Sequence, residues 1–184
     1  MQSLVLAVVI FVVVILCVVL VLCTVFFHVL HLVPFVPTES SVVTTMLDLA
    51  KLRPGDRIVD LGAGDGRFLI SAVRREPTIR AVGYEGAVGV WLLAQARIAI
   101  ARAPVKVRFR NFFRVDLSDV DVIFTYLSPR IMCLLADKFK RELKPGTRIV
   151  SHAFRLPELP PVEVRDVPLR SGGAKQIYSY VWGG

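Results

Sequence analysis

The segment VDLGAGDGRF, residues 59–68, combines a carboxylate with a glycine-rich turn. Asp60 precedes three glycines at alternate positions, Gly62, Gly64 and Gly66, and an apolar, helix-like run follows them. Glycine tolerates a positive φ and lets a ligand come close to the backbone, and the start of a helix attracts negative charge. The pattern therefore predicts a nucleotide-binding turn, with Asp60 placed to hold a ligand ammonium group directly or through water.

The spacing of the glycines distinguishes this turn from two common phosphate-binding motifs. The dinucleotide fingerprint is G-x-G-x-x-G, and Arg67 stands where its third glycine would be. A P-loop is excluded because no Gly-Lys-Ser/Thr sequence follows. Glu85 lies nineteen residues beyond Gly66, at the end of the next predicted strand, where an acid reaches ribose hydroxyls. An ammonium, a carboxylate and a ribose together describe S-adenosylmethionine better than NAD.

Strands that alternate with helices must position these residues. Such alternation implies right-handed crossovers and a parallel sheet, and the RSGGA segment between the last two strands indicates an antiparallel hairpin at one edge. The predicted fold class is α/β: a Rossmann-like, doubly wound, mostly parallel sheet with a C-terminal antiparallel hairpin. Its ligand is expected beyond the carboxyl ends of the strands. The predicted strands are 57–61, 79–85, 105–110, 121–127, 147–154, 162–169 and 175–182, and the predicted helices are 66–75, 87–102 and 129–143.

Two helices carry finer expectations. A short helix is expected before the first strand, with Thr38 or Ser40 as its N-terminal cap. The apolar residues of this short helix are Val42, Val43, Met46, Leu47 and Leu49. The residues that lie along one stripe of the helix 87–102 are Val88, Trp91, Leu92, Gln95 and Ala99.

The N-terminal region differs sharply in composition from the rest. All 23 Lys and Arg residues lie at or beyond Lys51, and the first acidic residue is Glu39. Residues 4–27 carry no charged side chain, and as a helix they would reach about 36 Å, enough to cross a hydrocarbon core of about 30 Å. A signal peptide is disfavoured, because the run is too long and no basic residue precedes it. We expect one N-terminal transmembrane helix, with the following domain on the cytoplasmic side, or on the matrix side in a mitochondrion.

This organisation predicts three parts: a transmembrane anchor at residues 1–33, a linker with the pre-domain helix at 34–55, and one folded domain at 56–184. The net charge of +8 is compatible with nucleic acid binding. A domain tethered at an anionic leaflet is also expected to be basic, so the lipid bilayer is the favoured partner and no nucleic acid is expected. The three cysteines form no CxxC or Cys/His cluster, so neither a metal site nor a disulfide framework is expected.

Several segments carry a family resemblance. DLGAGDGR and GYE resemble motif I and the strand-two acid of class I S-adenosylmethionine-dependent methyltransferases. One branch of these methyltransferases is similar to this chain over longer segments. These segments are the apolar anchor, PFVPTESSVVTTMLDLAKLRPGDRIVDLGAGDGR, DLSDVDVIFTYLSPRIM and LKPGTRIVSHAF. This branch is the membrane-anchored mitochondrial lysine methyltransferases that modify the ATP synthase c-subunit and the adenine nucleotide translocase, with their prokaryotic relatives. The resemblance covers nearly the whole chain and implies methylation of a protein lysine on a membrane-associated substrate.

The resemblance also implies roles for individual positions. The turn of Gly62, Ala63, Gly64 and Gly66 would wrap the methionine part of the cofactor, supported by Asp60, and Glu85 would hold its ribose. Asn111 would meet the adenine amino group through its carbonyl oxygen, and Phe112 would pack on the adenine. These two residues fit equally well as a polar turn residue and a core aromatic residue.

The segment TYLSP, residues 125–129, lies at the exit of the fourth predicted strand, where methyl acceptors approach. Tyr126 is the candidate residue for steering a substrate amine, with Ser128 and Pro129 on the substrate side, although a buried strand tyrosine explains it equally well. Thr38 is also predicted on the substrate side, where it either closes over the cofactor or caps a helix. The NPPY-type signature is absent from this segment, which argues against DNA adenine as substrate.

Methyl transfer from a sulfonium is an in-line displacement with a good leaving group. The protein mainly has to align the two reactants and exclude water, and an apolar pocket that lowers a lysine pKa makes a dedicated base unnecessary. No base is therefore nominated. Two alternatives remain open: a methyltransferase for a small amphiphile, such as a lipid headgroup or a quinone precursor, and a non-catalytic membrane-tethered adaptor.

Overall fold

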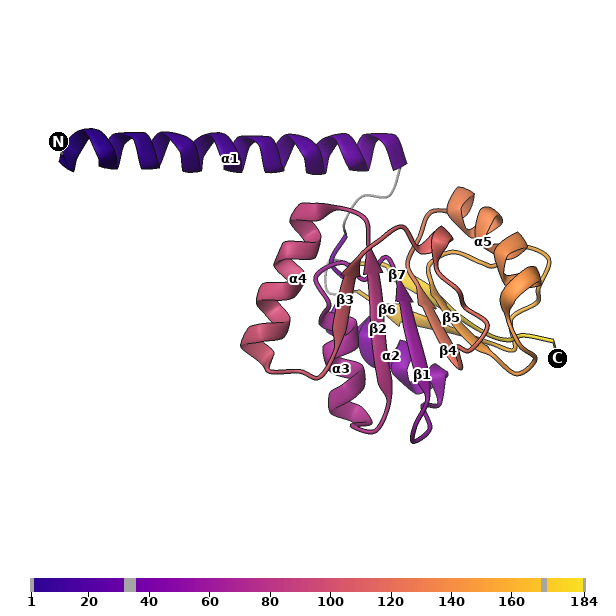
Figure 1. The fold of residues 1–184 in the computed structure, drawn as a ribbon. Coiled ribbons are helices and arrows are strands. Elements are labelled where there is room, and N and C mark those ends of the chain that lie inside the picture. Colours follow the sequence, from indigo (N-terminus) through magenta and orange to yellow (C-terminus); the bar gives the residue numbers. More distant parts are fainter. Residues whose placement is uncertain (1, 32–35, 170–171, 184) are drawn as a thin grey trace.

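The computed structural model describes residues 2–31, 36–169 and 172–183. Its strands form one sheet of seven in the order β3-β2-β1-β4-β5-β7-β6 (Figure 1). The first five strands in the sequence are parallel, and β7 runs antiparallel between β5 and β6. This confirms the predicted doubly wound sheet with a C-terminal hairpin. The strands are β1 Arg57–Leu61, β2 Arg80–Glu85, β3 Lys106–Phe109, β4 Val122–Thr125, β5 Arg148–His152, β6 Glu163–Pro168 and β7 Ala174–Val181.

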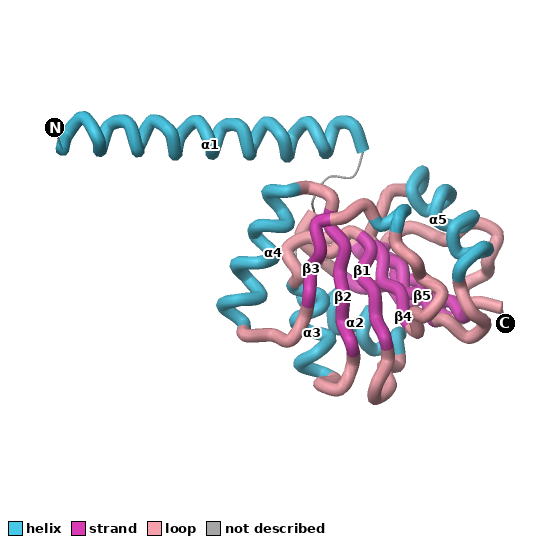
Figure 2. Tube along the Cα trace, viewed as in Figure 1, coloured by secondary structure: helices cyan, strands magenta, loops and turns pink. Residues whose placement is uncertain are grey.

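Helices cover both faces of the sheet (Figure 2). One apolar core joins Ile58 and Phe124 to α2, α3 and α4, and a second joins Val59 and Ile123 to α5. Successive residues of one strand thus point to opposite layers, as the strand period of two requires. The helices are α1 Gln2–His31, α2 Ser40–Ala50, α3 Arg67–Arg75, α4 Val88–Ala101 and α5 Pro129–Glu142, with a 3₁₀ turn, η1, at Phe112–Arg114.

The strand order reverses at the centre of the sheet. The chain moves outward from β1 through β2 to β3, then returns to place β4 on the other side of β1. The loops that follow β1 and β4 therefore diverge at their carboxyl ends, and a crevice forms there. This edge of the sheet, called the carboxyl edge below, is where the predicted ligand-binding turn lies.

The structure corrects the expectation for the cap of α2. Glu39 is the N-cap residue and its side chain makes no capping hydrogen bond, whereas Ser40 is the first residue of the helix. Neither Thr38 nor Ser40 is therefore the cap. Three hydroxyl residues within four positions (38–41) give more than one starting point for a helix, so the first turn could not be predicted from the sequence alone.

The buried side of α4 also differs from the predicted stripe. Val90 and Ala94 are the buried residues of this helix, whereas Leu92 is 44% exposed. The sequence VWLLAQARIAIA is apolar on nearly every side, so its periodicity does not fix which side meets the sheet. Because α4 is apolar on nearly every side, Leu92 and Leu93 remain exposed.

The N-terminal helix is apolar throughout its length. The segment Gln2–Phe26 is long and apolar enough to cross a membrane, and it is not buried against the domain. It lies across the end of the domain at which α4 begins (Figure 1). The expected boundary between anchor and linker, at residues 33 and 34, lies outside the described residues.

Candidate active site

A cavity of about 330 Å³ opens at the carboxyl edge. Its wall is built from the segment before α2, the glycine turn after β1, the end of β2, the loop after β3 and the end of β4. Residues far apart in the sequence therefore meet because parallel strands place their carboxyl ends together. The predicted site residues that line the cavity are Thr38, Asp60, Gly62, Ala63, Gly64, Glu85, Asn111, Phe112 and Tyr126.

The glycine turn has the backbone conformation that its sequence predicts. Gly62, Gly64 and Gly66 have φ angles of +84°, +56° and +74°. The amides of Gly62 and Ala63 both donate to the carbonyl oxygen of Tyr84, at 3.0 Å each, and so attach the turn to β2. Gly66 precedes α3 and does not line the cavity; a β-carbon there would meet Ile98 at 3.5 Å. The cavity wall is therefore formed by the first part of the turn.

Glu85 connects the end of β2 to the glycine turn. Its Oε2 accepts a hydrogen bond from the amide of Gly64 at 3.0 Å, and Oε1 accepts from the amides of Gly86 and Ala87 at 2.8 Å each. The residue is buried, and its carboxylate is fixed at the cavity wall. A carboxylate held in this way is pre-oriented for ligand hydroxyls, because its position is set before any ligand arrives.

Asp60 is the most perturbed acid of the site. Burial raises its pKa from 3.8 to about 7, with further contributions from the nearby carboxylates of Glu85 and Asp65. Its side chain makes no hydrogen bond or ion pair with any residue that the structure describes. A ligand cation at the cavity wall would stabilise its ionised form, so the structure favours a cationic group beside Asp60.

Asn111 and Phe112 line the cavity from the loop after β3. The Oδ1 of Asn111 accepts a hydrogen bond from the amide of Phe113 at 2.9 Å and thereby caps η1. The phenyl rings of Phe112 and Phe113 lie 4.8 Å apart, and Phe109 adds a third aromatic side chain to the wall. Asn111 is thus the polar turn residue of the simpler interpretation, and its carbonyl oxygen retains one lone pair for a ligand.

The substrate-side predictions separate into two groups. Tyr126 lines the cavity, and burial raises the pKa of its hydroxyl, which is therefore neutral. Ser128 and Pro129 do not line the cavity; Ser128 is the N-cap residue of α5 and Pro129 is its first residue. The helix instead contributes Ile131 to the wall, close to its start.

His152 was not anticipated from the sequence. Its ring lies 3.9 Å from that of Tyr126, and it is 4% exposed. Burial lowers its pKa to about 4, with a smaller effect of Lys175, so the imidazole is neutral at pH 7. Neither ring nitrogen has a hydrogen-bond partner within the described part of the chain. The signal that pointed to it was its position at the end of the fifth predicted strand, next to the exit of the fourth.

Arg67 is a second residue that sequence reasoning missed. Its guanidinium binds Asp65 through Nε at 3.0 Å and Nη2 at 2.7 Å, and its Nη1 donates to the backbone oxygen of Thr38 at 3.1 Å. Arg97 lies 3.2 Å from the same carboxylate, and these cations lower the pKa of Asp65. The network fastens the segment before α2 to the glycine turn. The arginine that replaces the third glycine of the dinucleotide motif was the available signal.

Comparison with protein families then places the chain. A family model described as the ANTKMT methyltransferase domain matches residues 60–163, which run from Asp60 to β6. The chain belongs to this methyltransferase family. The match contains the glycine turn, Glu85 and the segment around Tyr126, and it confirms the family resemblance seen in the sequence.

Curated relatives of this methyltransferase act on protein lysines by name. A protein-lysine N-methyltransferase of Saccharolobus islandicus is 37% identical over 156 residues, which are 82% of this chain and 94% of the relative. The adenine nucleotide translocase lysine N-methyltransferase of Mus musculus is 37% identical, and the ATP synthase c-subunit lysine N-methyltransferase of Homo sapiens is 30% identical. The matches cover 72% and 71% of this chain, and the chain spans 58% and 56% of the length of these two relatives.

Solved structures agree with the fold and the cofactor. An RNA methyltransferase from Salinibacter ruber in complex with S-adenosyl-L-homocysteine superposes with a TM-score of 0.71 at 33% identity, covering 79% of this chain and 93% of that one. The protein is therefore an S-adenosylmethionine-dependent methyltransferase with a Rossmann-like fold.

The residues of the methyltransferase fit this cofactor. No described residue gives Asp60 a counter-charge, which an ammonium would supply. Glu85 is fixed at the wall for hydroxyl groups, and the positive-φ glycines leave the backbone open. Phe109, Phe112 and Phe113 provide flat apolar surface on the wall formed by the β3 end and its loop. No group of three or more His, Cys, Asp or Glu side chains suited to a metal ion occurs among the residues described.

Proposed function

We propose that this methyltransferase is anchored in a membrane by α1 and methylates the side-chain amine of a lysine in a membrane-associated protein. The acceptor end of the cavity carries this proposal. It is formed by Thr125, Tyr126 and Leu127 of the β4 exit and by Ile131 of α5, and none of these side chains is charged at neutral pH. The names of the curated relatives, protein-lysine methyltransferases, support the same substrate class.

A neutral wall suits a lysine acceptor for a physical reason. A lysine side chain has a pKa near 10.4, and only its neutral amine can attack a methyl group. Burial in an apolar environment disfavours the ammonium form and so lowers this pKa. S-adenosylmethionine supplies the electrophilic methyl group. The residues Tyr126 and Leu127 hold the amine in line and exclude water, which supplies most of what this displacement requires.

The membrane part of the proposal is supported by α1 and by the distribution of charge. The segment Gln2–Phe26 is long enough to span a bilayer, and every Lys and Arg lies C-terminal to it. By the positive-inside rule, the domain at 56–184 would lie on the cytoplasmic side, or on the matrix side in a mitochondrion. A tether raises the effective concentration of neighbours in the same membrane and disfavours soluble substrates.

The proposal is tested by incubating the purified full chain with methyl-labelled S-adenosylmethionine and membranes. We expect label in protein that survives lipid extraction and ribonuclease, and methyl-lysine after acid hydrolysis. Label in the organic extract would identify a small amphiphile as the acceptor. Label lost to ribonuclease would identify RNA, the acceptor class for which the Salinibacter ruber relative is named. Either result would refute the lysine assignment. The variant Glu85→Ala, with the cofactor site impaired, is the negative control.

A further inference from the structure

Residues that follow α1 closely in the sequence, from Val36 on, form part of the active-site wall. The helix ends at His31, and Val36 already lines the cavity. Five residue steps of at most about 3.6 Å limit the separation of these two residues to about 18 Å. The cavity is therefore held near the end of the apolar helix, whatever the tilt of that helix in a bilayer.

A direct contact places the start of α4 at the same point. Gly89, in the first turn of α4, faces Thr24 so closely that a β-carbon would lie 2.6 Å from the threonine Oγ1. Thr24 belongs to the last turn of the candidate span Gln2–Phe26. Because α4 begins at Val88, three residues after the last residue of β2, the carboxyl edge of the sheet is the edge next to the end of the span.

The exposed residues at this edge are suited to a lipid surface. Phe109 is 55% exposed at the end of β3, the edge strand of the sheet, and it packs on Trp91 with ring centroids 5.9 Å apart. Arg108 and Arg110 flank it in the sequence, and both are exposed. Apolar aromatic side chains between arginines are typical of surfaces that enter the boundary of an anionic bilayer.

We infer that the carboxyl edge of the domain faces the bilayer, with Arg108 in contact with anionic phospholipid headgroups. Phe109 and Arg110, which also line the cavity, lie beside it at the same edge. This inference rests on the proposed function and deepens it, since it restricts the acceptor to a lysine at the membrane surface. A lysine far from the bilayer would have to approach from the opposite direction, past the folded domain. The substrate is then a membrane protein whose target lysine lies at the level of the headgroups.

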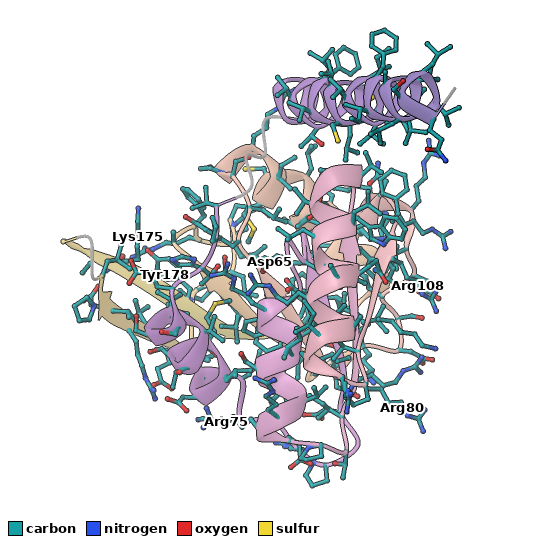
Figure 3. All side chains as sticks on the ribbon, turned by 90° about the vertical axis from the view of Figure 1, so that its left-hand side faces the viewer. Asp65, Arg75, Arg80, Arg108, Lys175 and Tyr178 are labelled. Atoms are coloured by element: carbon teal, nitrogen blue, oxygen red, sulfur yellow. The ribbon has the colours of Figure 1, made fainter. Side chains whose placement is uncertain are left out.

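The chain offers a matched pair of positions for a test. Arg80 begins β2, and Arg108 pairs in register with Tyr84, four residues further along that strand. The two arginines therefore lie on the same face of the sheet, about 13 Å apart along the strands. Both are exposed and neither lines the cavity, and Arg108 is the one closer to α1 (Figure 3).

The first experiment measures the distance of each position from lipid. A fluorophore is attached at Arg108→Cys or Arg80→Cys of the full chain, with Cys17, Cys23 and Cys133 replaced by serine, in nanodiscs that contain phosphatidylserine. We expect a headgroup nitroxide lipid to quench the label at position 108 at least threefold more than the label at position 80. Equal quenching, or stronger quenching at position 80, would overturn the proposed orientation.

The second experiment measures activity. Arg108→Glu and Arg80→Glu change the charge equally, and we expect Arg108→Glu to lower the methylation of anionic membranes roughly fivefold or more and Arg80→Glu to change it less than twofold. The affinity for S-adenosylhomocysteine is the control and should be equal in both. Equal losses of activity would contradict the inference. Release of the chain from membranes by carbonate would refute the membrane anchor of the proposed function. If the chain stays in the membrane but positions 108 and 80 give equal quenching and equal activity, only the orientation is refuted.

Discussion

The perturbed carboxyl of Asp60 predicts that cofactor binding depends on pH. In the free protein its pKa is about 7, because the group is buried beside Glu85 and Asp65. A cofactor ammonium beside it would restore an ordinary pKa near 4, so the ligand binds the ionised form and releases a proton. Affinity therefore falls as the pH decreases below 7, because Asp60 must then lose a proton before the cation can bind.

The two pKa values set the size of this effect. With a free pKa of about 7 and a bound pKa near 4, the dissociation constant at pH 5.5 should exceed that at pH 7.5 roughly 25-fold, or by about 2 kcal/mol. Binding should release about 0.9 proton at pH 6 and about 0.2 proton at pH 7.5. The prediction covers pH values up to 7.5, because the α-amino group of the ligand itself titrates near pH 7.7–8.0.

Calorimetry of S-adenosylhomocysteine in two buffers of different ionisation enthalpy measures both quantities. Asp60→Asn should bind with little dependence on pH, because the amide does not titrate. 5′-Methylthioadenosine, which has neither the ammonium nor the carboxylate, should bind the wild-type protein without proton release. Affinity that is independent of pH in the wild type, or an unchanged dependence in Asp60→Asn, would refute the role assigned to this carboxyl.

Three further predictions concern groups around the site. Arg67→Lys loses the planar fork that joins Asp65 to the backbone of Thr38, so calorimetry should show S-adenosylhomocysteine binding weakened about tenfold; unchanged affinity would contradict the anchoring role of Arg67. Gly83→Ala would place a β-carbon 2.5 Å from that of Ala63, so urea denaturation should show about 1–3 kcal/mol lower stability, and an equally stable variant would rule out this contact. Burial lowers the pKa of His152 from 6.5 to about 4 in the folded protein. The imidazole is therefore protonated more readily in the unfolded chain, and the free energy of unfolding decreases as the pH falls below 6.5, by about 2 kcal/mol at pH 5. Urea unfolding of His152→Phe at pH 7.5 and pH 5 should not show this decrease. An equal decrease in the wild type and in His152→Phe would contradict the role of the buried imidazole.

The backbone architecture could be predicted because its signals are local. The apolar run 121–127 identified a central strand, and the structure has β4 at Val122–Thr125 between β1 and β5. The alternation of strands and helices then fixed the handedness and parallel order of the sheet. Because Asp60 and Glu85 lie near the carboxyl ends of neighbouring parallel strands, their meeting at one edge followed from the topology alone.

Side-chain contacts between distant segments were not predictable in this way. The ring contact of Tyr126 with His152 requires β4 and β5 to be neighbours and both side chains to point to the same face. The bond from Arg67 to the backbone of Thr38 joins residues 29 positions apart and depends on where α2 docks. Ser128 does not line the cavity, and the sequence did not show that the chain turns into α5 at this residue.

The distribution of counter-charges around the cavity explains which cation the site lacks. Three acidic side chains, those of Asp60, Asp65 and Glu85, line the cavity. Asp65 is neutralised by Arg67 and a second arginine, and three backbone amides stabilise Glu85. For Asp60 the described residues supply neither, so in the free protein a proton takes the place of a counter-charge. A cationic ligand offsets the repulsion of the Asp60 carboxylate by Glu85 and Asp65, and a neutral ligand does not. The cavity therefore distinguishes S-adenosylmethionine from neutral nucleosides by the positive charge of the ligand.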